Sequence, residues 1–162
     1  MKIRMAEAQD LDRLSGIWYD GWQDAHARIL PAELARHRTR ESFSQRLRAA
    51  LDEVRVTGPA GCPSAFCIAT GDELYQLYAS AEARGTGAAA ALLADGEARI
   101  AGRGFRSAWL ACGIGNQRAA RFYEKHGWVR AGNMTSELPT PDGPFLLEVW
   151  RYEKTLADRP GT

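Results

Sequence analysis

Apolar residues in the first part of the chain recur at helical spacing. Leu11, Leu14, Trp18 and Trp22 follow one another at intervals of three or four residues, which places them on one face of a helix over residues 8–26. Because both tryptophans share this face with leucines, the pattern favours a role for them in the hydrophobic core.

The same kind of pattern predicts the other helices. They are expected over residues 30–37, 39–54, 87–101 and 116–127. Asp10 and Thr39 stand where two of the helices begin. Each is expected to act as a cap, because a short polar side chain can accept a hydrogen bond from a free backbone N–H group.

Short apolar or alternating runs bounded by turn residues predict the strands. These runs cover residues 1–6, 54–58, 64–71, 71–80, 106–112, 128–138 and 145–156. No repeat, low-complexity tract or linker interrupts the order of elements. We therefore expect a single α/β domain over residues 1–156, followed by a frayed C-terminal tail over residues 157–162.

The composition is that of an ordinary soluble globular protein, with 162 residues of which 45% are hydrophobic and 25% charged. The 21 lysines and arginines nearly balance the 20 aspartates and glutamates, so the net charge of +1 gives no general attraction to nucleic acid or membranes. We expect neither as a partner. Early charges do not fit a signal peptide and no apolar run approaches membrane length, so the cytoplasm is the expected location.

Three cysteines, Cys62, Cys67 and Cys112, are an odd number and lack paired CxxC spacing. This argues against a disulfide framework and against a zinc site. We expect buried, reduced thiols and no bound metal.

A glycine-rich stretch precedes the helix expected over residues 87–101. It reads Arg84-Gly85-Thr86-Gly87 and runs directly into alanines and leucines. Glycines at a helix start let the backbone approach a ligand closely, and the free N–H groups there attract anions. The stretch therefore predicts a phosphate-binding loop, with the arginine as an additional cation.

Two nucleotide-binding motifs compete for this loop. Residues 85–90 satisfy the GxGxxA pattern of dinucleotide-binding proteins, which also requires an acidic residue about 20 positions later. None is found, because no Asp or Glu occurs between Glu97 and Glu124. The P-loop pattern GxxxxGK[ST] is absent as well, so the sequence disfavours both motifs.

Two segments resemble the signatures of the GNAT acetyltransferase superfamily. Its Q/R-x-x-G-x-G/A pattern stands at residues 84–89, and its N-x-x-A-x-x-[FLI]-Y-E-K-x-G-[FW] pattern at residues 116–128. One departure is Ala81, where many members have proline. The resemblance covers nearly the whole chain and implies the GNAT fold, an α/β (α+β) structure. Its mixed, mostly antiparallel sheet of about seven strands has a central splay and is flanked by about four helices.

The resemblance also implies acetyl-CoA as the co-substrate. In the superfamily the glycine loop holds the pyrophosphate of CoA, and the strand before the loop pairs its backbone with the pantetheine arm. Carried over to this sequence, the expected cofactor contacts are Leu77, Tyr78, Ala79, Arg84, Gly85, Thr86, Gly87, Ala88, Ala89 and Asn116. Asn116 is equally well placed to cap its helix, and the two roles are compatible.

Transfer of an acetyl group to an amine requires two proton transfers. Tyr123 matches the tyrosine that donates a proton to the departing CoA sulfur in the superfamily. The alternative is a packing role, because Tyr123 forms a stripe at helical spacing with Ala119, Phe122 and His126.

Glu73 is the candidate general base, since some relatives use a glutamate at this place to deprotonate the amine. It lies on the strand that enters the loop, where alternation predicts that Glu73, Tyr75, Leu77 and Ala79 share one face. The alternative is an exposed carboxylate at the end of a strand.

In the superfamily the first helices and the last strands frame the acceptor. This makes Tyr19, Trp22 and His26 the candidate substrate contacts, with a structural role as the alternative for the histidine. The leading hypothesis is an acetyl-CoA-dependent N-acetyltransferase, a monomer or a homodimer, that acetylates a primary amine of a small molecule or peptide N-terminus. It would act by direct attack in a ternary complex. The alternatives are a non-catalytic acyl-CoA binding or sensing module and a nucleotide-dependent α/β enzyme.

Overall fold

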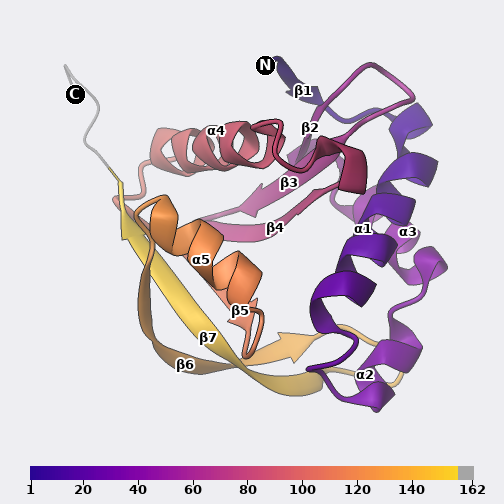
Figure 1. Ribbon diagram of the computed structural model, residues 1–162, viewed down its shortest axis with the longest axis vertical. Helices are drawn as coiled ribbons and strands as arrows, with labels where there is room; N and C mark the ends of the chain where they lie inside the picture. The colour runs from indigo at the N-terminus through magenta and orange to yellow at the C-terminus, as the bar shows by residue number, and fades with distance from the viewer. Residues whose placement is uncertain (157–162) are drawn as a thin grey trace.

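One seven-stranded sheet organises the computed structural model, which describes residues 1–156 (Figure 1). The strands are β1 (Ile3–Met5), β2 (Val54–Thr57), β3 (Ala65–Thr70), β4 (Glu73–Ala79), β5 (Ser107–Gly113), β6 (Val129–Leu138) and β7 (Phe145–Thr155). Their order in the sheet is β1-β2-β3-β4-β5-β7-β6, and every neighbouring pair is antiparallel except β4 with β5. The predicted mixed, mostly antiparallel sheet is confirmed. The tail predicted at residues 157–162 lies outside the described residues.

Five α-helices lie within residues 1–156. They are α1 (Leu11–His26), α2 (Ala32–His37), α3 (Arg40–Ala49), α4 (Ala88–Gly102) and α5 (Gln117–Lys125). Every predicted helix is present. The one predicted over residues 39–54 ends at Ala49, because residues 51–53 form a 3-10 turn and Val54 opens β2. None of the described helices is long and apolar enough to cross a membrane.

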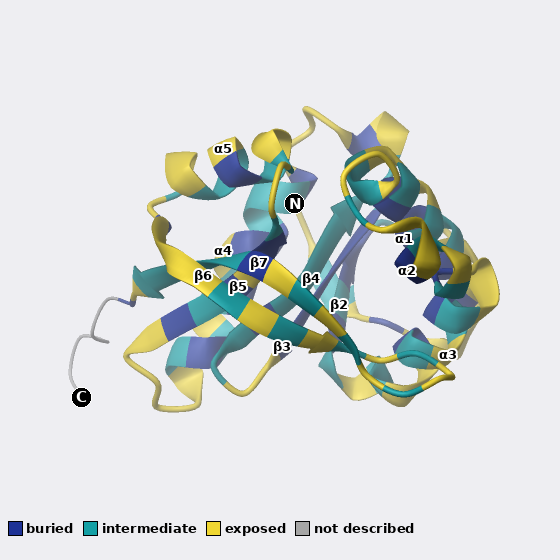
Figure 2. Cartoon of the chain, turned by 90° about the horizontal axis from the view of Figure 1, so that it is seen from below, coloured by how far each residue is buried: buried dark blue, intermediate teal, exposed yellow. Residues whose placement is uncertain are grey.

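Helices cover both faces of the sheet (Figures 1 and 2), and β3 is buried on both sides. Phe66 and Ile68 of β3 pack in the core under α1 and α3. The residues beside them, Ala65, Cys67 and Ala69, pack in the second core, under α4 and α5. β3 therefore reads as an apolar run, whereas β6, at the edge of the sheet, is mostly exposed.

Trp18 and Trp22 are both buried in the core under α1 and α3, as their helical spacing predicts. Of the cysteines, Cys67 and Cys112 are buried free thiols, as expected, but Cys62 is exposed. The expectation for Cys62 is wrong because this residue lies in the surface turn between β2 and β3.

The two predicted helix caps differ in outcome. Thr39 accepts a hydrogen bond from the backbone N–H at the third position of α3, which confirms the prediction. Asp10 does not cap α1. Its fully buried carboxylate pairs with Arg4 at 2.8 Å and accepts the N–H groups of Glu7 and Gly61. The prediction for Asp10 is wrong because a guanidinium is the stronger partner for a buried carboxylate.

The sheet opens between β4 and β5. Among the described residues these strands register at a single pair, Glu73 with Trp109. Beyond this pair the two strands diverge. From there to Ala79 the side of β4 that faces β5 has no strand partner in the described part of the chain, while the other side pairs with β3. The predicted central splay is therefore present.

A β-bulge interrupts β4 close to the splay. The pairing of β3 with β4 skips Tyr75, which makes it an extra residue and shifts the alternation of the side chains around it. Tyr75 packs against the core under α1, whereas Leu77 and Ala79 pack against the core under α4 and α5. The prediction that these three residues share one face with Glu73 is therefore wrong.

Candidate active site

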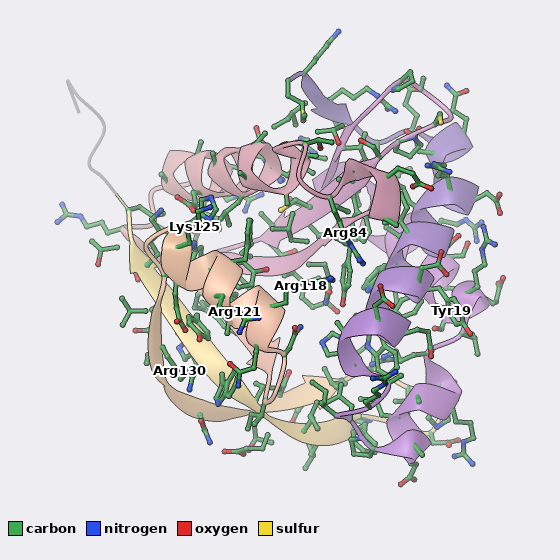
Figure 3. All side chains as sticks on the ribbon, in the orientation of Figure 1. Tyr19, Arg84, Arg118, Arg121, Lys125 and Arg130 are labelled. Atoms are coloured by element: carbon green, nitrogen blue, oxygen red, sulfur yellow. The ribbon has the colours of Figure 1, made fainter. Side chains whose placement is uncertain are left out.

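A cleft of about 600 Å³ lies where β4 and β5 diverge, between α1, α5 and the N-terminal end of α4. Figure 3 shows Arg84 and Arg118 pointing into the space between α5 and α1. Of the predicted site residues, those that line the cleft are Trp22, His26, Glu73, Leu77, Tyr78, Ala79, Arg84, Gly85, Gly87, Ala88, Ala89, Asn116 and Tyr123. Tyr19 and Thr86 are not among the lining residues. The fold thus brings nearly the whole predicted set together.

The glycine loop presents backbone N–H groups to the cleft. Gly85 and Gly87 have φ angles of +79° and +88°, a conformation that other residues rarely adopt, and a Cβ at either position would point into open space. Gly87 is the N-cap residue of α4, so the first N–H groups of this helix have no carbonyl partner one turn earlier. Together with the helix dipole they form a site suited to an anion.

Hydrogen bonds of Thr86 to neighbouring residues stabilise the conformation of the glycine loop. The Thr86 hydroxyl donates to the carbonyl of Ala83 and accepts the N–H of Ala88 at 3.4 Å. Its own backbone N–H also donates to the carbonyl of Ala83. The expected contact between Thr86 and the cofactor is therefore not supported, because the donors of this residue are already used.

Arg84 connects the loop to α1. Its guanidinium donates to the carboxylate of Asp24 at 2.9 Å, and this bond lowers the pKa of Asp24 below its usual value. The side chain of Arg84 remains 39% exposed. An anion arriving at the loop would compete with Asp24 for this cation.

The unpaired edge of β4 runs along the cleft, where Leu77, Tyr78 and Ala79 all line it. The ring of Tyr78 lies so close to α1 that a Cβ on Gly21 would approach it to 2.4 Å. A glycine in α1 is thus required for β4 and the helix to pack together. Asn116 accepts the N–H at the third position of α5, at 3.3 Å, which confirms its role as N-cap and leaves its cofactor contact a prediction.

Tyr123 lines the cleft from α5, and it is partly buried. Trp128 and Tyr152 pack against it, with ring centroids 6.1 Å and 6.4 Å away. Burial raises the pKa of Tyr123 well above its ordinary value, so the hydroxyl stays protonated. The cleft therefore contains a neutral phenol able to donate a proton. Phe122 beside it packs against the core under α4 and α5.

Glu73 stands at the point of the splay. Burial, with a further contribution from the adjacent carboxylate of Asp72, raises the pKa of Glu73 to about 7, while Arg151 acts in the opposite direction. Asp72 itself accepts a hydrogen bond from the indole N–H of Trp109 at 3.0 Å. A carboxylate with a pKa near neutrality is suited to take up and release protons.

His26 reaches the cleft, whereas Tyr19 does not. His26 packs against Trp22 with ring centroids 5.4 Å apart and lies against Gly113 at the end of β5. Burial lowers the pKa of His26 to about 4, so the ring is neutral at pH 7. Tyr19 lies on the other side of α1 (Figure 3) and packs against the core under α1 and α3. The expectation of a substrate contact at Tyr19 is therefore not supported by the fold.

Comparison with known proteins agrees with this geometry. Residues 11–128 match the sequence model of the Acetyltransferase (GNAT) family. The chain belongs to the GNAT acetyltransferase family. Among curated protein sequences, none matches the chain.

Several solved GNAT structures share the fold. A GCN5-related N-acetyltransferase from Rhodopseudomonas palustris has a TM-score of 0.75 at 20% identity, covering 96% of this chain and 95% of its own. The PaiA N-acetyltransferase from Thermoplasma acidophilum, in complex with coenzyme A, has a TM-score of 0.64 at 19% identity, covering 95% and 98%. YncA from Salmonella typhimurium, with its cofactor acetyl-CoA, has a TM-score of 0.65 at 14% identity, covering 100% and 97%. At these identities the likeness shows the fold.

This GNAT chain also has cleft residues that the sequence analysis did not single out. Arg118 and Lys125 both line the cleft from α5, and their spacing of seven positions, which places them on one helix face, was a signal available in the sequence. Arg38 and Arg46 line it as well. Arg46 follows Phe43 by three positions and therefore lies beside the apolar face of α3. A cation at such a position was the signal in the sequence that could have indicated Arg46.

Proposed function

We propose that this chain is an acetyl-CoA-dependent N-acetyltransferase that acetylates a primary amine of a small molecule or of a peptide N-terminus. One observation carries the proposal. A single cleft combines a helix start suited to an anion, an unpaired strand edge, a partly buried phenol and a carboxylate with a pKa of about 7. Membership of the GNAT family supports acetyl transfer, and the neighbours solved with coenzyme A or acetyl-CoA support this co-substrate.

The α4 end of the cleft suits the phosphates of acetyl-CoA. The free N–H groups at Gly87, Ala89 and Ala90 would bind pyrophosphate oxygens. Arg118 and Lys125 add positive charge from α5. The amide groups of the pantetheine arm would pair with the open edge of β4 as an additional strand does.

The two titratable side chains would then serve the reaction in a ternary complex. Glu73 accepts a proton from the acceptor ammonium, and the neutral amine attacks the acetyl carbonyl carbon. A C–N bond forms, the C–S bond breaks, and Tyr123 donates its proton to the departing sulfur. The amine loses its second proton to solvent, Tyr123 regains one from solvent, and Glu73 releases its own. The products are an N-acetyl amide and the free thiol of CoA.

An amine panel tests the proposal. The purified protein is mixed with acetyl-CoA and single primary amines, including free amino acids, alkyl amines and short peptides, and thiol release is followed. We expect release that depends on both the protein and the amine. Binding of acetyl-CoA is measured in parallel by thermal shift, since a ligand that binds the folded state raises its melting temperature.

The two readouts separate the alternatives. Binding of acetyl-CoA without thiol release from any amine would replace the proposed enzyme with a non-catalytic acyl-CoA binding module. Stabilisation by NAD or ATP, and none by acetyl-CoA, would indicate a nucleotide-dependent protein instead.

A further inference from the structure

Two arginines that the proposed reaction does not use line the cleft. Arg38 lies between α2 and α3, and Arg46 lies on α3. Arg38 is only 3% exposed, which is unusual for a residue with a permanent charge. Burial, together with the nearby charge of Arg46, lowers the pKa of Arg38 to about 10. The guanidinium therefore remains charged at pH 7 in a place that disfavours the charge.

Both guanidiniums are held in fixed positions. Arg38 donates through Nη1 to the backbone carbonyl of Pro139 at 2.7 Å, in the connection between β6 and β7, which reaches α2 in Figure 1. Arg46 donates to the hydroxyl of Tyr75 at 2.6 Å, and its guanidinium lies 4.4 Å from the ring centroid of Trp18. Fixed donors lose little entropy when a ligand binds, so they suit recognition of a specific group.

No carboxylate pairs with either arginine within residues 1–156. The buried Nη2 atom of Arg38 has no hydrogen-bond partner there. Among residues 1–156 the cleft is lined by five arginines and lysines, whereas Glu73 is the one carboxylate that lines it. Because a buried charge is normally paired, the missing partner of Arg38 and Arg46 is expected to come from a ligand.

The geometry points to a carboxylate on the acceptor: we infer that Arg38 and Arg46 bind the carboxylate of a small acceptor that also carries the primary amine. This inference rests on the proposed N-acetyltransferase function and deepens it. Planar guanidinium groups match the two oxygens of a carboxylate. The phosphates of acetyl-CoA have their own donors at the α4 end, where N–H groups and the cations of α5 lie.

The position of Arg46 agrees with this assignment. Its partner Tyr75 lies on β4, two residues after Glu73. The anion-binding end and the proposed base thus belong to the same strand. A small molecule with its carboxylate on the arginines can therefore direct its amine along β4 toward Glu73, provided that the chain between the two groups has the right length.

A matched series of acceptors tests the inference. Each set contains an amino acid, its carboxamide and the corresponding amine without the carboxylate, with one to five carbons between amine and carboxylate. In the wild type we expect the kcat/KM of the best amino acid to exceed that of its carboxamide by about 10- to 100-fold, the usual effect of a charge-assisted hydrogen bond. Arg46→Gln should bring this ratio close to one, and Arg46→Lys should restore part of it.

Arg48→Gln is the matched control, because Arg48 is an exposed residue on the same helix and does not line the cleft. It should leave the ratio at its wild-type value. A ratio near one in the wild type, or an unchanged ratio in Arg46→Gln, would overturn the inference. So would an aminoalkyl phosphonate that is acetylated in preference to every amino acid.

A binding measurement separates this inference from the proposed function. A carboxylic acid without an amine should raise the melting temperature of the wild type and inhibit competitively with the acceptor, but should do neither with Arg46→Gln. If no amine of any kind releases thiol, the proposed function fails. In that case, a thermal shift with the carboxylic acid that is lost in Arg46→Gln still supports the anion site. A thermal shift that Arg46→Gln keeps, or none in the wild type, overturns the anion site.

Discussion

At the scale of single residues, Tyr123 is the side chain whose proposed role is most sharply testable. Tyr123→Phe keeps the ring that packs against Trp128 and Tyr152 but removes the proton donor. We expect turnover to fall about 10²- to 10⁴-fold, with the affinity for acetyl-CoA unchanged. Steady-state kinetics and calorimetric titration measure the two quantities.

Tyr152→Phe is the matched control for this substitution. Tyr152 is a buried tyrosine in contact with Tyr123, but its hydroxyl donates to Glu124 at 2.6 Å and it does not line the cleft. Its variant should keep wild-type turnover. Wild-type turnover in Tyr123→Phe would instead make Tyr123 a packing residue and leave water to protonate the sulfur.

The pKa of Glu73 predicts a pH-rate profile. With a free-enzyme pKa of about 7, the base is active only when deprotonated, so kcat/KM should rise through pH 7 toward a plateau. In Glu73→Gln this limb should disappear and the remaining rate should follow the pKa of the amine itself. A limb with an unchanged midpoint in the variant would contradict the role of Glu73 as the general base.

The same residue predicts how stability changes with pH. Folding raises the pKa of Glu73 from 4.5 to about 7, so the folded state binds the proton more tightly than the unfolded state. Stability from this group therefore falls as pH rises from 4.5 to 7. Chemical denaturation measures the free energy of unfolding of Glu73→Gln and of the wild type. The value for the variant minus the value for the wild type should be larger at pH 8 than at pH 4. An equal difference at both pH values would mean that the carboxylate titrates normally.

At the scale of elements, the start of α4 depends on Gly87. Gly87→Val puts a branched side chain at φ +88° and into the open space before the helix, where it would cover the free N–H groups. We expect the affinity for acetyl-CoA to fall by roughly 1–3 kcal/mol, the range for lost hydrogen bonds to a charged group. Calorimetric titration measures the loss.

Gly104→Val separates this effect from backbone strain. Gly104 has φ +95° and equally open surroundings, but it follows the other end of α4 and does not line the cleft. Both variants should lose stability, by about 1–2 kcal/mol for a left-handed residue. If Gly104→Val weakens the binding of acetyl-CoA as much as Gly87→Val does, the loop has no specific part in binding.

Elements that depend on local signals could be predicted from the sequence. Thr39 caps α3 because its side chain reaches a backbone N–H three residues away, and the glycine loop is visible in the order of its own residues. Asp10 could not be predicted in this way, since its partners Arg4 and Gly61 are brought to it by the tertiary fold. The bulge at Tyr75 likewise depends on the pairing with β3.

The residues of the candidate site likewise fall into those that local sequence indicates and those that only the tertiary fold brings together. Motifs locate residues such as Tyr123 and Gly87, because contiguous segments contain them. Arg38 and Arg46 come together only when α3, the end of β6 and the bulged strand β4 meet. Tyr19 does not line the cleft, and the sequence could not indicate this, since helical periodicity alone does not say which face of α1 turns toward the cleft.

At the scale of the whole molecule, the ion pair between Arg84 and Asp24 joins the glycine loop to α1. Arg84→Ala should weaken the binding of acetyl-CoA by about 1–3 kcal/mol and reduce its dependence on salt. Asp24→Asn should tighten the binding of acetyl-CoA, because the phosphates no longer compete with the Asp24 carboxylate for Arg84. The gain should be only a few-fold, since an exposed ion pair is worth at most about 1 kcal/mol. Titrations at several salt concentrations measure both effects. Weaker binding in Asp24→Asn would show that the carboxylate positions Arg84 for the ligand.

The splay has a consequence for cooperativity. Apart from the pair of Glu73 with Trp109, no backbone ladder among the described residues joins β1–β4 to β5–β7–β6. Without ligand, the sheet therefore consists of two half-sheets able to open at different free energies. Amide hydrogen exchange should be fast along the free edge of β4, and the two halves should differ in protection. If acetyl-CoA pairs with that edge, amide exchange should slow in both half-sheets together. Unchanged exchange on addition of acetyl-CoA would mean that the helices alone already join the two half-sheets. A substrate that lies in the gap as a strand would then hold the two half-sheets together as one folding unit for as long as it stays bound.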